Sequence, residues 1–375
     1  MPKINSKLSI LVAHFRPDIV SGAEFAIGDM VKKCPKNFRF IMLTPGAGNL
    51  GDYYQSHDFE IWPKRIETTR RKYPGLHTLQ SYLFARQLQA KGIDAVIANT
   101  FPAASRVQTA CRFAGIPYAI YVREYISDKP LHRAILARAD KIFAVSGDVA
   151  AYLSPMVDPG KIVPVHDHLH AEPLIDRLET RGPKRFAGDQ PVVGIIGRIT
   201  SYKQQDLFVR AIPWVAKAVP EARFVIVGNA SERERAYEGE LRRLASKLQV
   251  EDRLAFLGHR TDALEIMTEL TVCCLTSDRE PFPRTVLEAQ LAGCAVIASD
   301  TGGCPEMIEG GVTGLLFPST RPDSHERLAE KIIRLLGDDA LRQRLAINAK
   351  EKLMQTFASD MPVRQFEAHL RSLIR

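Results

Sequence analysis

The feature of this sequence that most restricts its fold is a regular alternation of short apolar runs with longer segments of helical period. In the first half, apolar runs that predict β-strands lie at residues 8–13, 38–44, 95–98, 118–122 and 141–145. Segments that predict helices separate them, at residues 23–33, 76–90, 103–113, 130–139 and 147–152. This repetition is typical of a parallel sheet with helices on its faces. The first half therefore predicts an α/β domain.

The same alternation starts again after a polar stretch, residues 172–190, that is rich in Gly, Pro, Lys and Arg. The later apolar runs lie at residues 192–196, 223–227, 254–257, 272–275, 295–298 and 314–317. A chain of 375 residues suits two domains, each with its own core. We expect two Rossmann-like parallel-sheet lobes that face a cleft: an N-terminal domain at residues 1–178, a linker at 179–190, a C-terminal domain at 191–355 and a crossover helix at 356–375 that packs back on the N-terminal domain.

Charge and cysteine content narrow the classes of partner. The formal net charge of +8 favours an anionic partner, although a soluble surface with a modest basic surplus accounts for it equally well. Six cysteines show no metal-ligand spacing, so no zinc site is expected. The apolar runs are too short to cross a bilayer, and we expect a cytoplasmic protein.

The most informative residues follow the first strand of the second domain. There the chain runs through two glycines into Arg198 and then Lys203, just before a helix. Ligands of parallel sheets bind at the carboxyl ends of strands, where glycines let the backbone approach and cations attract phosphate. This segment predicts a diphosphate site. A strand-end turn with two solvated bases is the alternative.

Two glutamates eight residues apart, Glu280 and Glu288, follow the fourth strand of that domain. Their carboxylates can accept paired hydrogen bonds from vicinal hydroxyls of a sugar or a ribose. The N–H groups of Arg284 and Thr285, in the first turn of the next helix, can attract a phosphate. The spacing alone proves little, but its position after a strand favours a nucleotide-sugar site.

With these motifs in place, the sequence resembles the retaining glycosyltransferases of family GT4, which have the two-domain GT-B fold. Arg198 and Lys203 resemble the diphosphate-binding pair of that family, and Glu280 and Glu288 its pair of glutamates. Residues 298–306 (ASDTGGCPE) and 310–314 (GGVTG) resemble the segment that follows the glutamates. The first half is similar more loosely, through residues 21–24 (SGAE) and 139–146 (ADKIFAVS).

The resemblance implies a hexosyltransferase-type enzyme that moves a sugar from a nucleoside diphosphate sugar to a saccharide or lipid-linked acceptor, with retention of anomeric configuration. It implies that two cations neutralise the leaving diphosphate, so that no metal ion or other cofactor is required. Glu280 would hold the donor sugar and Glu288 the ribose. The catalytic residues would be Arg198, Lys203 and Glu280, and the donor site would comprise Gly22, Arg198, Lys203, Glu280, Phe282, Arg284, Thr285 and Glu288.

The sequence departs from the family pattern in its first half. Ser21 stands where relatives usually have a glycine. Arg123 and Glu124 stand where relatives often carry a histidine, and they are either acceptor-side contacts or a structural ion pair. Residues 165–170 (VHDHLH) place three histidines at alternate positions, for which we expect a solvated turn rather than a metal site.

One basic segment of the first half points to a membrane. Trp62 and Tyr73 accompany five cations, namely Lys64, Arg65, Arg70, Arg71 and Lys72. Basic residues mixed with aromatics suit an anionic lipid surface at which a lipid-linked acceptor is presented, and we expect peripheral binding at the cytoplasmic face of the membrane. A solvated loop with two buried aromatics is the alternative.

Three other functions agree less well with the sequence than sugar transfer does. An NAD-dependent dehydrogenase lacks support because the G-x-G-x-x-G fingerprint is incomplete. A nucleic-acid-binding protein rests on the net charge alone, so we expect no nucleic-acid partner. A nucleotide-sugar epimerase of the GT-B fold remains the nearest alternative. The sugar, the base and the acceptor do not follow from the sequence.

Overall fold

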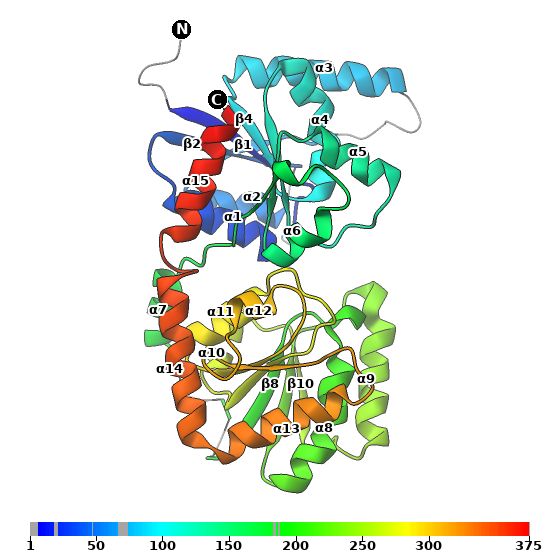
Figure 1. Cartoon of the computed structure of the whole chain (residues 1–375), viewed down its shortest axis with the longest axis vertical. Coiled ribbons are helices and arrows are strands. Elements are labelled where there is room, and N and C mark those ends of the chain that lie inside the picture. Colours follow the sequence, from blue (N-terminus) through cyan, green and yellow to red (C-terminus); the bar gives the residue numbers. More distant parts are fainter. Residues whose placement is uncertain are drawn as a thin grey trace. The chain divides into compact units, whose positions relative to one another are not determined.

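The computed structural model describes residues 7–18, 22–46, 48–66, 74–182, 185–186 and 188–374 (Figure 1). The chain divides into two compact units. The first comprises the residues up to Leu169 together with those from Asp360 onward, and the second comprises His170–Ser359. Each unit has its own parallel sheet, as the alternation of strands and helices predicts.

The sheet of the first unit has the strand order β3-β2-β1-β4-β5-β6-β7, and its paired strands are parallel. The five predicted strands are confirmed, and their side chains are mostly buried because helices cover both faces. Two edge strands were not predicted, since they are short and only partly buried. The strands are β1 (Leu8–Ala13), β2 (Phe38–Thr44), β3 (Glu60–Pro63), β4 (Ala95–Ala98), β5 (Tyr118–Val122), β6 (Lys141–Ala144) and β7 (Ile162–Pro164).

The helices of the first unit alternate with these strands. A left-handed Gly115 ends α4, with φ of 67°, a conformation that glycine adopts without steric cost. The helix α2 was not predicted, because it is short and follows a loop with few apolar residues. The helices are α1 (Gly22–Lys33), α2 (Asn49–Ser56), α3 (Pro74–Ala90), α4 (Phe101–Ala114), α5 (Pro130–Arg138) and α6 (Gly147–Leu153).

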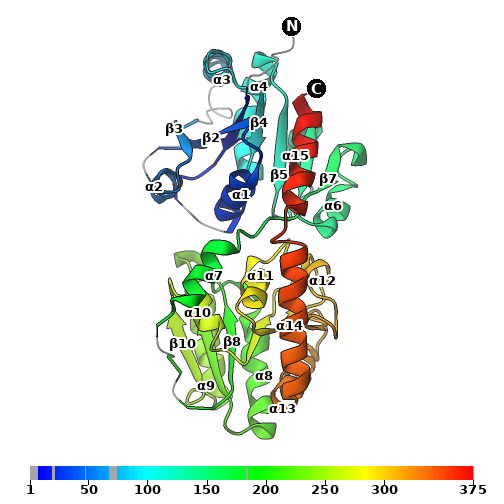
Figure 2. The ribbon, with the colours of Figure 1, turned by 90° about the vertical axis from the view of Figure 1, so that its left-hand side faces the viewer.

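The last helix of the chain, α15 (Met361–Ile374), packs on the first unit (Figure 2). Phe366 is fully buried, and its ring centroid lies 6.4 Å from that of Tyr121 and 5.5 Å from that of Phe143. Lys141 Nζ donates a hydrogen bond to Ser372 Oγ at 2.5 Å. The predicted crossover helix is thus confirmed, and the sheet residues that it covers explain its position.

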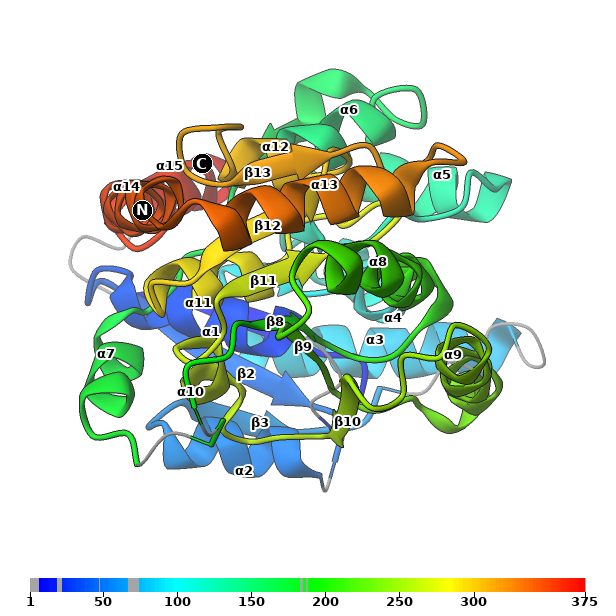
Figure 3. The same ribbon diagram turned by 90° about the horizontal axis from the view of Figure 1, so that it is seen from below.

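The sheet of the second unit has the order β10-β9-β8-β11-β12-β13, again with parallel pairs. All six strands were predicted. Figure 3 looks onto this unit, where α8 (Gln205–Ala218) and α13 (Ser324–Gly337) pack side by side. The strands are β8 (Val192–Ile196), β9 (Arg223–Val227), β10 (Leu254–Gly258), β11 (Val272–Leu275), β12 (Ala295–Ser299) and β13 (Leu315–Phe317).

The remaining helices of this unit pack against the sheet or against one another, as α11 and α14 do. They are α9 (Arg235–Lys247), α10 (Ala263–Met267), α11 (Arg284–Leu291), α12 (Cys304–Met307) and α14 (Asp339–Gln355). The core lies between the sheet and helices such as α8 and α13, and includes Phe208, Phe224 and Phe317. The helices α13, α14 and α15 follow one another in sequence without an intervening strand.

The stretch that the sequence analysis interpreted as a linker is partly helical. Residues 172–179 form α7 (Glu172–Glu179), which packs on α10 of the second unit. Arg177 binds Glu265 at 2.8 Å, and Arg185 binds Glu269 at 2.9 Å. The contacts place the division of the chain at Leu169–His170, earlier than the expected residues 179–190, because these ion pairs join the polar stretch to the second unit.

Candidate functional site

The loop after β8 is shaped by two glycines with positive φ. Gly197 has a φ of 148°, and a Cβ on it would lie 3.5 Å from Lys203 Nζ. A Cβ on Gly228, which follows β9, would lie 1.9 Å from the carbonyl oxygen of Gly197. The two strand ends can approach this closely only because Gly228 lacks a side chain, while Gly197 supplies the positive φ. The loop then forms a 3₁₀ turn, Ser201–Lys203, before α8 begins.

Lys203 forms an ion pair with Glu280, a residue of the loop after β11. The distance from Lys203 Nζ to Glu280 Oε1 is 3.1 Å, and the two side chains are 11% and 12% exposed. Two further hydrogen bonds hold the loops together: Thr276 Oγ1 donates to the carbonyl of Lys203 at 2.7 Å, and the N–H of Asp278 donates to the carbonyl of Tyr202 at 2.9 Å. The structure therefore brings together two of the predicted catalytic residues.

The electrostatics of this pair leave one carboxylate oxygen unused. Burial alone would lower the pKa of Lys203, but the Glu280 carboxylate outweighs it and the pKa is raised, so the lysine stays charged at neutral pH.

Oε2 of Glu280 is buried and has no hydrogen-bond partner among the described residues. Buried polar atoms are normally paired, and a ligand hydroxyl would satisfy this oxygen.

Arg198 differs from Lys203 in its surroundings. Its side chain is exposed, while its carbonyl accepts a hydrogen bond from Gln205 Nε2 at 2.8 Å. The positive charge of Arg198 acts on Lys203 and slightly opposes the rise in the pKa of that lysine. Two cations therefore lie near one another after β8, one buried and one open to solvent, as a diphosphate site requires.

The helix α11 carries the second predicted glutamate. Glu288 lies one turn from Arg284, and its Oε1 is 3.8 Å from Arg284 Nε. Thr285, in the first turn, is half-buried. Phe282 was predicted as a donor contact, but it is buried and its ring centroid lies 5.3 Å from that of Phe357, so its observed packing partner is a core aromatic. Glu280 and Glu288 thus belong to two separate ion pairs.

The backbone of Glu280 is held by a loop that sequence analysis noted only as part of a family segment. Gly302 follows β12 and has a φ of 61°, and a Cβ on it would lie 2.2 Å from the carbonyl oxygen of Glu280. The same carbonyl accepts a hydrogen bond from the N–H of Gly303 at 2.8 Å. The glycine pair was visible in the sequence, but its contact with Glu280 was not.

Gly302→Ala is therefore expected to displace Glu280. Its effect should exceed that of Gly293→Ala, because Gly293 has a similar φ of 74° but no atom within 4 Å of the added Cβ. Both variants incur backbone strain of about 1 kcal/mol, and the clash at Gly302 adds about 2 kcal/mol. Urea unfolding measures the difference, and calorimetry should show weaker nucleotide-sugar binding for Gly302→Ala alone. Equal stability of the two variants would contradict the proposed clash.

In the first unit, the predicted residue Arg123 lies in a buried polar cluster. Arg123 Nη2 is 2.9 Å from Asp167 Oδ1, Arg123 Nη1 donates to Asn99 Oδ1, and the guanidinium lies 3.4 Å from the centre of the Tyr121 ring. Glu124 is exposed. Arg123 thus forms an ion pair, and its partner is Asp167 rather than the adjacent glutamate.

His14 belongs to the same cluster and was missed by sequence analysis. It follows β1 and is buried, and its Nε2 has no hydrogen-bond partner in the part of the chain that the structure describes. Burial, aided by the positive charge of Arg123, lowers the pKa of His14 to about 3. The ends of β1, β4 and β5 thus contribute His14, Asn99 and Arg123 to one buried cluster.

This histidine should make the first unit acid-sensitive. The unfolded chain binds a proton at His14 near pH 6.5, whereas the folded chain does so only near pH 3, so stability is present above pH 6.5 and is lost as the pH falls. Between pH 6.5 and pH 5 the loss from His14 is about 2 kcal/mol. Urea unfolding at both pH values should show this loss in the wild type and in His57→Gln, whose histidine is exposed, but not in His14→Gln. An identical pH dependence in all three would contradict the assignment.

The other predicted residues lie apart from these two clusters. Gly22 is the first residue of α1 and is exposed. Lys64 and Arg65 line a cavity beside α3, while Arg70, Arg71 and Lys72 lie outside the described residues, as do Ser21 and Tyr73. His168 is only 1% exposed, so the expectation of a solvated turn is wrong there: the turn lies between buried residues, Val165 and Leu169.

Metal-binding clusters and membrane-spanning helices are both absent from the residues that the structure describes. These residues contain no group of three or more His, Cys, Asp or Glu side chains arranged to hold a metal ion. None of the described helices combines the length and the apolar character needed to span a bilayer.

Comparison with protein families identifies the class of protein. Residues 176–352 match the model of the family "Glycosyl transferases group 1", and these residues contain the glycine loop, the Lys203–Glu280 pair and α11. The second unit is therefore similar to group 1 glycosyltransferases over most of its length, and the two parallel sheets of the chain are those of the GT-B fold.

Individual relatives are more distant. The chain is 27% identical over 245 residues to the lipopolysaccharide core biosynthesis mannosyltransferase LpsB of Rhizobium meliloti (strain 1021), which is 64% of this chain and 68% of that protein. It is 27% identical over 255 residues to N-acetyl-alpha-D-glucosaminyl L-malate synthase of Bacillus anthracis (66% and 65%). It is 28% identical over 238 residues to D-inositol 3-phosphate glycosyltransferase of Mycobacterium ulcerans (strain Agy99) (61% and 50%). The matches span about half to two thirds of these curated relatives.

Solved structures of similar fold cover almost the whole chain. Anabaena Alr3699/HepE, solved in complex with UDP, has a TM-score of 0.80 and 22% identity over 98% of this chain and 100% of that one. A glycosyltransferase from Rickettsia africae has a TM-score of 0.82 and 18% identity over 99% and 100%. At this level of identity the likeness concerns the fold.

Proposed function

We propose that this protein transfers a sugar from a nucleoside diphosphate sugar to a saccharide or lipid-linked acceptor, with retention of anomeric configuration and without a metal ion. One observation carries the proposal: the buried Lys203–Glu280 pair, at the ends of β8 and β11, presents a charged lysine and an unpartnered carboxylate oxygen in one place. A diphosphate and a sugar hydroxyl would satisfy these two groups.

In the proposed reaction the acceptor oxygen bonds to the anomeric carbon while the bond from that carbon to the diphosphate breaks. The electron pair of the broken bond stays on the diphosphate, and the acceptor proton passes to the released phosphate oxygen. Arg198 and Lys203 stabilise the charge that develops there, which is the task that a metal ion performs in other transferases. Glu280 positions the sugar through its hydroxyls.

The remaining contacts are assigned to the nucleotide and the acceptor. The N–H groups in the first turn of α11, at Arg284 and Thr285, suit a phosphate, and Glu288 suits the ribose hydroxyls. We assign Gly22 to the diphosphate and Phe282 to a supporting role behind the donor. Arg123, already bound to Asp167, and Glu124 are assigned to the acceptor side. The printed activities of the relatives and the UDP bound to Anabaena HepE support a donor of this class.

Release of nucleoside diphosphate from a panel of nucleotide sugars tests the proposal. With a saccharide or lipid-linked acceptor present, release is expected to accompany formation of a glycoside, and it should persist in EDTA. The coupling constant of the anomeric proton in the product should match that of the donor. Sugar transfer that stops in EDTA would contradict metal independence, and conversion of the donor to an epimer without transfer would favour the epimerase.

The acceptor is proposed to reach the enzyme at the cytoplasmic face of a membrane, to which the protein binds peripherally. Lys64 and Arg65 are the described members of the basic segment that supports this location. A relative that acts in lipopolysaccharide core biosynthesis is consistent with a lipid-linked acceptor.

A further inference from the structure

The outward face of α3 carries a row of apolar side chains. Leu76, Leu79 and Leu83 recur at helical spacing and are 44%, 54% and 52% exposed, and Tyr82 beside them is 51% exposed. Among the described residues, four of the twelve exposed large apolar side chains belong to this helix. Single exposed leucines are ordinary, but a contiguous row marks an interaction surface. We call these four residues the leucine row.

The opposite face of α3 accounts for the stability of the helix. Phe84, Ala85 and Leu88 are buried, and the ring centroids of Phe84 and Trp62 lie 5.6 Å apart. The leucine row is therefore not needed to hold α3 in place. It is available for a partner outside the chain.

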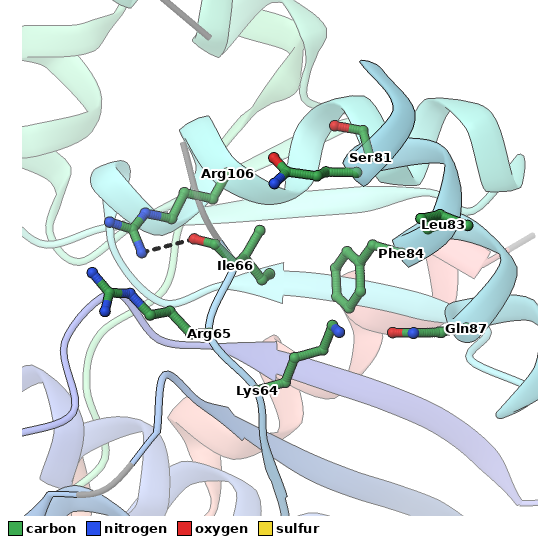
Figure 4. A pocket seen from close by; sticks show the side chains of 9 residues that line it. Lys64, Arg65, Ile66, Ser81, Leu83, Phe84, Gln87 and Arg106 are labelled. Atoms are coloured by element: carbon green, nitrogen blue, oxygen red, sulfur yellow. Dashed lines mark hydrogen bonds between the residues drawn. The ribbon is translucent and has the colours of Figure 1, made fainter. Parts of the chain in front are cut away.

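A cavity of about 240 Å³ lies beside the leucine row (Figure 4). Leu83 belongs to its lining, so the row and the cavity are continuous. Lys64, Arg65 and Arg106 also line it, and no carboxylate of the described residues does. In Figure 4 the guanidinium groups of Arg65 and Arg106 lie toward the same end, and Arg106 Nη1 donates to the carbonyl of Ile66 at 3.0 Å. Such a site suits an anionic group such as phosphate.

The sequence of this part of the chain is mostly basic. The sequence from residue 61 to residue 91 contains seven basic residues and a single acidic one, Glu67. Arg86 and Lys91, at the end of α3, are both exposed, and Lys91 Nζ lies 4.8 Å from the Trp62 ring centre. A second copy of this chain would bring like charges together, whereas an anionic surface would be attracted.

We propose that the leucine row and the cavity together form a contact surface for an anionic lipid bilayer. The leucines enter the boundary between headgroups and acyl chains, and a lipid phosphate occupies the cavity between Lys64, Arg65 and Arg106. Apolar residues flanked by cations are the composition of helices that lie in such an interface. The proposal rests on the proposed function, in which the protein binds a membrane peripherally, and it identifies the surface that makes the contact.

Sedimentation with vesicles tests this surface. The full-length protein is mixed with vesicles of phosphatidylcholine and phosphatidylglycerol, or of phosphatidylcholine alone. The wild type should bind the anionic vesicles, and the triple variant Leu76→Gln, Leu79→Gln, Leu83→Gln should bind at least about tenfold more weakly. The double variant Arg65→Gln, Arg86→Gln should lose about fivefold in vesicle affinity for each charge removed. High salt should abolish the difference in affinity between this variant and the wild type, but not the difference between the leucine variant and the wild type.

Matched controls come from the second unit. Trp214 and Ile347 are exposed to a similar extent, 51% and 59%, and Lys217 and Arg243 are exposed cations. Their glutamine variants should bind vesicles as the wild type does. The leucine variant, the arginine variant and the two control variants all replace exposed side chains, so circular dichroism should show unchanged folding.

Three outcomes would overturn the proposal. The first is undiminished vesicle binding by the leucine variant. The second is full competition by inorganic phosphate at constant ionic strength, which would indicate a site for free phosphate. The third is a dimer in analytical ultracentrifugation that the leucine variant loses, with vesicle binding unchanged, which would assign the row to self-association. Calorimetry with UDP on the same samples tests the donor site separately, so failure there leaves the vesicle result standing.

Discussion

Lys203→Ala is expected to weaken nucleoside diphosphate binding by about one to two orders of magnitude and to lower transfer at least as much. A charge-assisted contact to phosphate contributes about 1.5 to 3 kcal/mol, and the contact strengthens as the leaving group gains charge. The substitution should also destabilise the second unit by about 3 kcal/mol, because it leaves the buried Glu280 carboxylate without its partner. Calorimetry with UDP or another nucleoside diphosphate and urea unfolding measure the two effects.

Two further variants separate binding from stability. Arg198→Ala should weaken diphosphate binding with little loss of stability, since the Arg198 side chain is exposed. The double variant Lys203→Met, Glu280→Gln removes both charges and should recover much of the stability without recovering diphosphate affinity. Unchanged affinity in both Lys203→Ala and Arg198→Ala would refute the diphosphate site.

Glu280→Gln and Glu288→Gln are expected to affect different parts of the donor. Glu280→Gln should lower transfer by about a hundredfold or more, the scale found when a single polar contact to a transition state is removed. Free nucleoside diphosphate has no sugar for Glu280 to hold, so its affinity should stay the same or rise slightly as Lys203 is released from its carboxylate partner. Measuring both the diphosphate affinity and the transfer rate of Glu280→Gln shows whether transfer is lost while diphosphate binding is kept.

Glu288→Gln should instead weaken nucleoside diphosphate and nucleotide sugar to the same extent, because both carry the ribose. The matched control is Glu238→Gln in α9, where Glu238 forms a comparable ion pair with Arg242 at 2.9 Å, one helical turn away. That control should leave both affinities unchanged. Loss of diphosphate binding in Glu280→Gln but not in Glu288→Gln would reverse the two assignments.

The strands and most helices could be predicted because their signals are local. Buried parallel strands such as β1 and β8 are short continuous apolar runs, and Gly115 marks a helix end through its left-handed conformation. The edge strands β3 and β7 and the helix α7 lack that signal. They are held by neighbours distant in sequence, as the Arg177–Glu265 contact shows.

The exposed face of α3 was likewise not predictable. Its helical period was clear, but leucines on a helix normally face the core. Here the core positions are taken by Phe84 and Leu88, so Leu76, Leu79 and Leu83 face outward. Only the packing of α3, chiefly against α4, shows which of the two apolar groups is buried.

By itself, the sequence determined the fold class and which residues lie after which strand, because both depend on apolar period and on residue order. Since parallel strands end at one edge of a sheet, it also predicted a site containing Arg198, Lys203, Glu280 and Glu288. Only the tertiary structure decided that Lys203 pairs with Glu280, 77 residues away, and that Glu288 pairs with Arg284. It alone assembled His14, Asn99, Arg123 and Asp167 in the first unit, because such contacts depend on how closely loops approach. In the second unit, the loops approach at Gly228 and Gly302, where a Cβ would separate them.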